Sequence, residues 1–235
     1  MKNARIIFLL LALPFSLARA ETPETYSVLG LALVDEHQYP SSKMSNIRGL
    51  SLSLFGEERQ SVQGVAVGLG PSWINRDMSG IQFMLLGSAA EKFNGIQFSG
   101  VYSANTTFDG VTFAGLFNLT GHGGISRGLQ IAGLLNIDGF SFSGYPDSTL
   151  VGGQIALLWN STPNLKGVQI ALGFNLAGEC AGLQIALFNY ATTLRGVQIG
   201  AVNIADKGSG LQIGLLNSFG TDDGRLIFPL VNMRF

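Results

Sequence analysis

The sequence predicts an all-β protein: an up-and-down antiparallel β-barrel of the outer-membrane type, with about 12–14 short repeated strands. Three observations lead to this expectation. A short motif recurs along most of the chain, residues within each copy alternate in character, and charged residues fall between the copies. Only 12% of the 235 residues are charged, whereas about 25% is usual in soluble domains. A surface with so few charges favours contact with something other than water.

The repeat begins with a glycine, followed by an aliphatic residue, usually a glutamine, and then a second aliphatic residue or phenylalanine. The clearest copies start at Gly167, Gly182, Gly196 and Gly210. Twelve copies carry the glycine, at positions 49, 64, 80, 95, 110, 128, 152, 167, 182, 196, 210 and 224. A nearly constant period indicates one structural unit used many times.

Alternation within each copy predicts strands. In the copy that starts at Gly167, one face holds Val168, Ile170, Leu172 and Phe174. The other face holds Gln169, Ala171, Gly173 and Asn175. A period of two is typical of strands, and repeated glycines disfavour helices by about 1 kcal/mol each. The nine-residue windows that start at the glycines from 64 to 210 contain no charged residue. The repeats therefore predict short strands from about residue 49 to 235, joined by polar turns, and residues 26–34 add one more strand.

The first twenty residues predict a secretory signal peptide. Lys2 and Arg5 precede an apolar run, and Ala18-Arg19-Ala20 fits a small-x-small cleavage site. Residues 21–235 then form a single β-repeat domain. Removal of three basic residues changes the formal net charge from −1 to −4. That balance favours neither nucleic acid nor anionic lipid as a partner.

Two features favour the barrel over other closures of the sheet. The late repeats alternate between valine and leucine after the glycine, at 168, 183, 197 and 211, as hairpin units would. Aromatic residues collect near strand ends, as in an interface girdle: Phe93, Tyr102, Phe108, Phe117, Trp159, Phe174, Phe188 and Tyr190.

The last strand resembles the terminal strand of bacterial outer-membrane barrels. Phe235 is the final residue, and Met233, Val231 and Ile227 precede it on the same alternating face, although Pro229 interrupts the strand. This resemblance implies that the outer-membrane bilayer and its barrel-insertion machinery are partners.

Two other architectures remain open. One is a β-solenoid with coils of 14–15 residues, in which the recurrent asparagines and glutamines form stacked amide ladders. The other is a soluble sandwich. In the barrel, the glutamines would instead line a constriction. Apolar residues below the glutamines count against a wide aqueous pore: Leu116, Leu134, Leu158, Phe188 and Leu216.

The repeated run Gly-Val-Gln-Ile-Gly-(Ala/Leu)-(Val/Leu)-Asn resembles that of a family of bacterial surface-repeat proteins. Residues 152–232 carry the resemblance well and residues 49–118 carry it weakly. It implies export and exposure at the cell envelope, and it supplies no catalytic or binding residues.

No motif predicts a catalytic, cofactor-binding or metal site, so we expect neither enzyme activity nor a cofactor. His37 and His122 lie far apart in polar segments, Cys180 is predicted to be a plain small residue, and Asp222-Asp223 to be a solvated turn. A barrel-embedded hydrolase would need a serine beside one of the histidines, with His122 the better base.

The sequence therefore predicts a non-enzymatic bacterial outer-membrane or cell-surface repeat protein with a structural, adhesive or channel-like role. The alternative is a soluble or peripheral β-solenoid binding protein that presents the loops 35–48 and 137–151.

Overall fold

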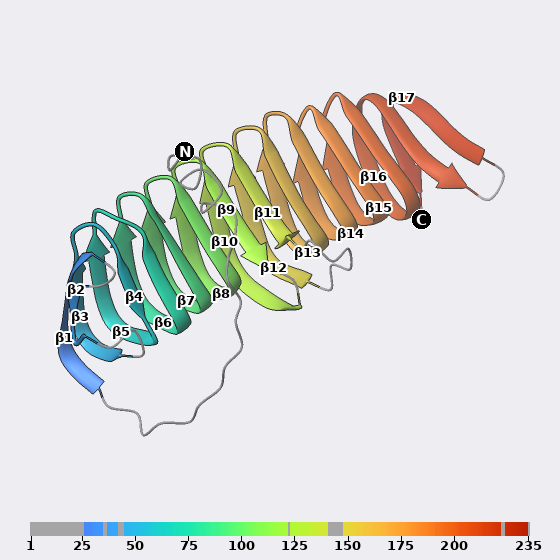
Figure 1. Ribbon diagram of the computed structural model, residues 1–235. Helices are drawn as coiled ribbons and strands as arrows, with labels where there is room; N and C mark the ends of the chain where they lie inside the picture. Colours follow the sequence, from blue (N-terminus) through green and yellow to red (C-terminus); the bar gives the residue numbers. More distant parts are fainter. Residues whose placement is uncertain are drawn as a thin grey trace, which may run out of the picture.

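The protein is a β-solenoid of about 11 turns. The computed structural model describes residues 26–34, 37–41, 45–121, 123–140, 148–221 and 224–234. Their strands form one sheet that winds along a single axis (Figure 1). The strands are β1 (Tyr26–Val34), β2 (His37–Tyr39), β3 (Asn46–Ser53), β4 (Glu57–Arg59), β5 (Ser61–Gly68), β6 (Ser72–Met84), β7 (Gly87–Ser99), β8 (Tyr102–Ala114), β9 (Phe117–Gly121), β10 (Gly124–Ala132), β11 (Leu135–Phe140), β12 (Ser148–Ala156), β13 (Trp159–Ala171), β14 (Phe174–Ile185), β15 (Phe188–Ile199), β16 (Val202–Thr221) and β17 (Gly224–Arg234).

Each coil is a flattened loop with two arms and two corners. In the coil that contains β14, the first arm covers residues 174–178 and the second covers residues 180–186. Side chains alternate between inside and outside along each arm, as a strand dictates. At a corner the chain places two successive residues outside, or three where the coil is one residue longer, as at 157–159. We call 178–179 and its equivalents the polar corner, and 187–188 and its equivalents the apolar corner.

Successive coils stack in parallel and in register. Gly167 pairs with Gly182, Gly182 pairs with Gly196, and Gly196 pairs with Gly210. Eleven of the twelve glycines that mark the sequence repeat form this column, from 49 to 210. A Cβ on Gly182 would lie 1.9 Å from the carbonyl oxygen of Gly167, and its φ is +155°. Only glycine fits such a close approach of backbone to backbone.

The barrel predicted from the sequence is wrong, and the solenoid alternative is confirmed. Strands of a meandering barrel pair antiparallel, whereas β5 to β8 and β12 to β16 pair parallel with the next coil. The sheet also has two ends, one at β1 and β2 and the other at β17. The valine–leucine alternation is therefore variation along one outer row and marks no hairpin unit.

The predicted terminal barrel strand is a cap. β17 pairs antiparallel with β16 and lies at the edge of the sheet (Figure 1). An edge position tolerates Pro229, because a proline there removes no ladder bond on its free side. Gly224 begins this cap and lies outside the glycine column. The structure has 17 strands, more than the 12–14 expected, because corners divide several coils into two.

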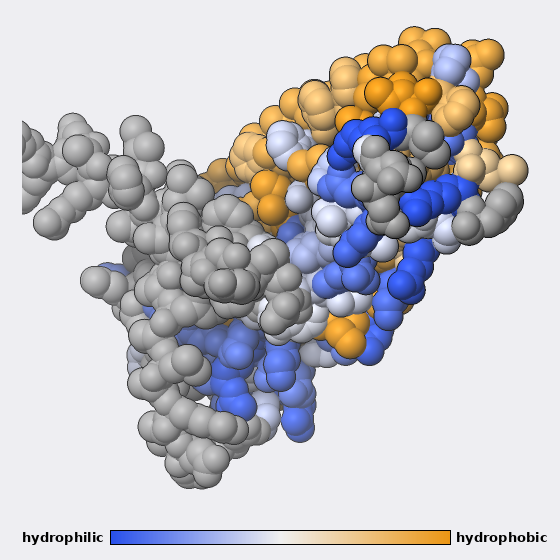
Figure 2. Space-filling view, turned by 90° about the vertical axis from the view of Figure 1, so that its right-hand side faces the viewer, coloured by the Kyte–Doolittle hydropathy of each residue, from blue (hydrophilic) through white to orange (hydrophobic). Residues whose placement is uncertain are grey.

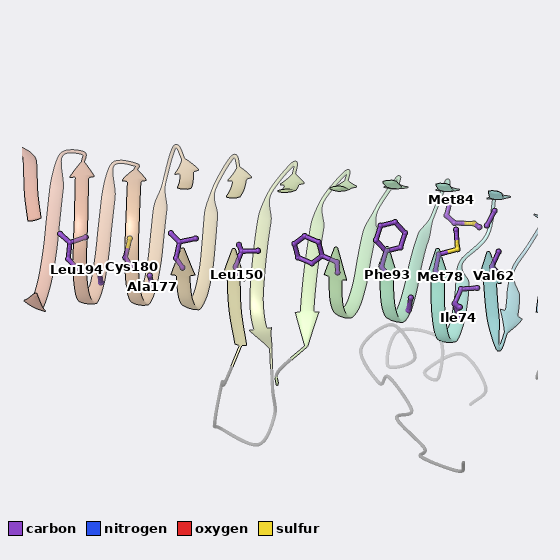
Figure 3. Packing of buried hydrophobic residues seen from close by; sticks show 14 of the residues in the cluster. Val62, Ile74, Met78, Met84, Phe93, Leu150, Ala177, Cys180 and Leu194 are labelled. Carbon is purple, nitrogen blue, oxygen red and sulfur yellow. The ribbon is translucent and has the colours of Figure 1, made fainter. Parts of the chain in front are cut away.

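An apolar row fills the half of the interior next to the polar corner. Phe93, Phe108, Leu165, Cys180 and Leu194 are all at most 2% exposed. Figure 3 shows buried apolar residues following one another along the solenoid, among them Phe93, Leu150, Cys180 and Leu194. Among the described residues, there is no helix with the length and apolar character needed to cross a membrane.

The glycine column predicts that Gly182→Ala is severely destabilising. The added methyl collides with a backbone oxygen that cannot rotate away, and the positive φ adds strain. We expect a loss of about 3 kcal/mol or more in the free energy of unfolding, measured by urea denaturation followed by circular dichroism.

Gly121→Ala is the matched control. A Cβ there would have Thr106 Cα as its nearest atom, at 3.2 Å, so we expect a loss within about 1 kcal/mol. Equal losses at the two glycines would contradict the stacked geometry.

Candidate functional site: an apolar corner over amide ladders

Glutamines form a ladder inside the solenoid. Gln184 Nε2 donates to Gln169 Oε1 at 2.8 Å, and Gln198 Nε2 donates to Gln184 Oε1 at 2.8 Å. The same bond recurs between 130 and 154, 154 and 169, and 198 and 212. These side chains are at most 1% exposed. The ladder confirms the structural interpretation of the recurrent glutamines, and they line no constriction.

Asparagines form a second ladder beneath the apolar corner. Asn175 Nδ2 donates to Asn189 Oδ1 at 3.0 Å and to the carbonyl oxygen of Ile185, in the opposite arm, at 2.9 Å. The side-chain bond runs through Asn118, Asn136, Asn160, Asn175, Asn189, Asn203 and Asn217. Each amide thus joins successive coils and also ties the two arms together where the chain turns.

The outer surface above these ladders is apolar. On the second arm, Val168 and Ile170 are 36% and 37% exposed, and Leu172 at the corner is 65% exposed. Leu187 and Leu215 occupy the corner in later coils and are 57% and 68% exposed. Viewed from the C-terminal end, apolar residues cover the upper part of the molecule and hydrophilic residues gather on the lower part (Figure 2).

Apolar side chains continue around the corner onto the first arm. Phe174 stacks on Phe188, with ring centroids 5.1 Å apart, and Trp159 lies 5.8 Å from Phe174. Tyr102 and Phe117 occupy the same row in earlier coils. Of the other aromatic residues expected in a girdle, Phe93 and Phe108 are buried in the apolar core row. Tyr190 lies on the first arm, two residues beyond the row of Phe188, and donates a hydrogen bond to Asp206.

Five residues assigned to the inner column by sequence alternation lie at the apolar corner. Leu116, Leu158, Phe188 and Leu216 are 37–53% exposed, and Leu134 occupies the equivalent position. The corner places two successive residues outside at 187–188 and three at 115–117 and 157–159, so a residue that alternation assigns to the inside faces outward there. That prediction was wrong because period-two counting assumes an unbroken strand.

The backbone at the apolar corner has its hydrogen bonds made within the solenoid. Leu187 N donates to Leu172 O at 3.1 Å, and Phe188 N donates to Gly173 O at 2.9 Å. One coil earlier, Leu172 N donates to Leu157 O at 3.0 Å. The corner thus presents alkyl and aromatic groups while these amides stay paired.

Strands occupy about half of each predicted loop, 35–48 and 137–151. β2 and the start of β3 lie in the first, and β11 and β12 enter the second. Residues 35–36, 42–44 and 141–147 lie outside the described residues.

Within the second of these segments, the carboxylate of Asp138 is buried and accepts hydrogen bonds from Ser148 Oγ at 3.0 Å and Thr162 Oγ1 at 2.6 Å. Burial raises the pKa of the Asp138 carboxyl.

A buried ion pair closes the N-terminal coils. Arg59 Nε lies 3.6 Å from Glu57 Oε2, and neither side chain is exposed. Glu57 accepts from Ser51 Oγ and Ser72 Oγ, at 2.5 and 2.9 Å. Arg59 donates to the carbonyl oxygens of Tyr39 and Pro40, at 3.1 and 3.0 Å. The pair thereby anchors β2 to the first coils, and sequence reasoning missed it because Glu57 lies in a degenerate part of the repeat.

Of the chemically reactive residues considered from the sequence, the structure describes His37 and Cys180. His37 is exposed in β2, whereas His122 and Asp222-Asp223 lie outside the described residues. Cys180 is buried in the core row, and burial raises the pKa of its thiol to about 12. The described segments contain no group of three or more His, Cys, Asp or Glu residues that could hold a metal ion.

Comparison with known proteins adds no relative. Neither the protein-family models, nor the curated proteins, nor the solved structures contain a match to this chain.

Breaking the glutamine ladder in its middle should cost more than removing its last rung. Gln184→Leu leaves the Gln169 acceptor unpaired and removes the acceptor for Gln198, so we expect a loss of about 2–4 kcal/mol. Nothing donates to Gln212 Oε1, and Gln212→Leu should cost at most half as much. Urea denaturation of both variants tests this difference, and a larger loss at Gln212 would contradict the ladder.

Ionisation of Asp138 should make stability depend on pH. Its raised pKa means that folding favours the protonated form, so this contribution is complete below the unfolded pKa of about 3.9. It is lost as pH rises through the folded pKa. Asp138→Asn cannot ionise, and its stability relative to the natural chain should therefore rise with pH from about 4 and then level off.

Urea midpoints of both proteins across this pH range provide the measurement, and Asp109→Asn, at an exposed site, controls for removal of a carboxylate. If the difference in stability between Asp138→Asn and the natural chain stayed constant with pH, burial would not change the ionisation of the Asp138 carboxyl.

Proposed function

We propose that the chain is an exported, peripheral β-solenoid of the bacterial envelope that acts as a non-enzymatic binding protein through its long outer surface. The observation that carries this proposal is the apolar corner, which repeats the same exposed residue types from coil to coil. A repeated surface of this kind suits binding to something extended. The signal-like residues 1–20 and the resemblance to bacterial surface-repeat proteins support the location at the envelope.

The packed interior favours binding over conduction. Gln169, Asn175, Gln184 and Asn189 fill the space between the arms with at most 2% exposure. Their donors and acceptors are committed to one another and to the backbone. A path for solutes would have to break these bonds, so we favour a role performed on the outside.

The buried nucleophile and carboxyl also favour a binding role over hydrolysis. The Cys180 thiol is enclosed by its neighbours in the core row, and the Asp138 carboxyl is enclosed by the hydroxyls of Ser148 and Thr162. The barrel-insertion machinery was expected as a partner because of a closed barrel. Since the last strand is a cap, this proposal does not include that machinery.

Cell fractionation tests the proposed location. When the full chain is expressed in a bacterium that exports through the general secretory route, we expect cleavage after Ala20, seen by mass spectrometry, and recovery in the envelope fraction. Urea or detergent should release the chain, because it is held at the surface. A matched chain without residues 2–20 should stay in the cytoplasm. Uncleaved cytoplasmic accumulation of the full chain would refute the proposal.

A further inference from the structure

We infer that the apolar corner inserts into one leaflet of a phospholipid bilayer, with the solenoid axis parallel to the membrane plane and the polar corner in water. This inference rests on the proposed envelope location and names the binding partner.

The half of the coil next to the apolar corner has reversed polarity. Its interior holds the asparagine and glutamine ladders, while its exterior holds Leu172, Leu187 and the phenylalanines beside them. The other half has the order usual in water, with Leu165 and Leu194 inside and Lys166 and Glu179 exposed. Apolar groups outside and paired polar groups inside are what a lipid environment requires. The change of order within each coil predicts a boundary between lipid and water.

The apolar surface is convex. From the apolar corner it extends along the second arm through Leu187 and Ile185 to Leu183. On the other side of the corner it continues onto Phe188 of the first arm. A second copy of the chain could cover one flat flank, but a ridge with two apolar flanks leaves the other flank in water. Fluid acyl chains surround a ridge on both sides, and we therefore favour lipid over self-association.

The depth of the ridge matches one leaflet. Leu183 and Leu187 are four residues apart on an extended arm, which corresponds to about 13 Å. Half of a hydrocarbon core is about 15 Å thick. The backbone amides of Leu172, Leu187 and Phe188 at the corner are paired within the solenoid, as lipid requires of backbone groups that enter it.

The apolar surface is also larger than a monomer in water normally shows. Thirteen strands from β1 to β17 contribute to the second-arm side, so the ridge is about 58 Å long at about 4.8 Å per strand. One flank then covers about 750 Å². The largest apolar patch on a typical monomer is about 300–600 Å².

Basic residues lie where lipid phosphates would be. Two residues below the apolar flank, one row of the second arm holds the exposed residues Arg48, Arg127, Lys166 and Arg195, together with Asp109 as its one acid. This row is about 20 Å from the corner, beyond the hydrocarbon and among the headgroups. Long basic side chains favour that level. The net charge of −4 without the leader favours zwitterionic over anionic phospholipids.

Vesicle binding with depth-dependent quenching tests the inference. The exported chain, purified after leader cleavage, is mixed with phosphatidylcholine–phosphatidylethanolamine vesicles and floated on a density gradient. The chain has two tryptophans, so W73F leaves Trp159 of the ridge as the only reporter. We expect flotation, and stronger quenching of Trp159 by bromines at the middle of the acyl chain than by bromines beside the headgroup.

Two triple variants with equal added charge distinguish insertion of the ridge from non-specific adsorption to the vesicles. L172D/L187D/L215D places carboxylates on the ridge, and binding should fall at least tenfold. T107D/N164D/T193D places the same charge at the polar corner, in the row that Lys92 and Glu179 occupy in neighbouring coils, and binding should stay within about twofold of the natural chain. Circular dichroism verifies that both variants keep their strands.

Absence of flotation, equal losses in the two variants, or headgroup-level quenching would each overturn the inference. A dimer in sedimentation velocity that L172D/L187D/L215D dissociates, with no vesicle binding, would assign the ridge to a second copy instead. A chain found in the envelope fraction of cells that does not bind vesicles would leave the proposed function standing. A chain that binds vesicles but is never exported would refute the proposed function alone.

Discussion

In-register stacking of identical residues is the constraint on which this structure depends. Because glycine lies on glycine from 49 to 210, the residues that follow it on the second arm also lie on their equivalents. Glutamine then meets glutamine at 2.8 Å and asparagine meets asparagine at about 3 Å. A shift of one residue between coils would turn amides outward and alkyl groups inward. The column of glycines and the two amide ladders therefore stabilise the same register between successive coils.

The ladders also determine what the outer surface can be. Asn175 and its equivalents tie the two arms together beneath the corner, so the corner needs no apolar core of its own. Its apolar side chains face outward, and Leu172 and Leu215 are among the most exposed large apolar residues that the structure describes. The opposite half keeps its apolar residues inside and its charges outside. One coil thus combines two environments, and stacking extends both along the whole molecule.

The sequence predicted the strands of this fold but not how they pair, because local patterns do not distinguish a barrel from a solenoid. Period-two alternation and the glycine spacing located the strands and predicted the ladders as one alternative, because both depend on local pattern. Barrel and solenoid share those patterns, and they differ in whether residue 182 pairs with 167 in parallel or by a hairpin. Corners were also invisible to alternation, which placed Leu158 and Leu216 inside. The ion pair of Glu57 and Arg59 depends on contacts that no repeat encodes.

Spin-label distances across the coils test the central claim most directly. With Cys180 replaced by alanine, labels at Val65→Cys and Leu211→Cys lie on the same outer row, nine coils apart. In-register stacking predicts a separation of about 43 Å at about 4.8 Å per coil. In a closed sheet these strands would approach one another again. A measured distance of about 20 Å or less would contradict the solenoid and everything that its stacking supports.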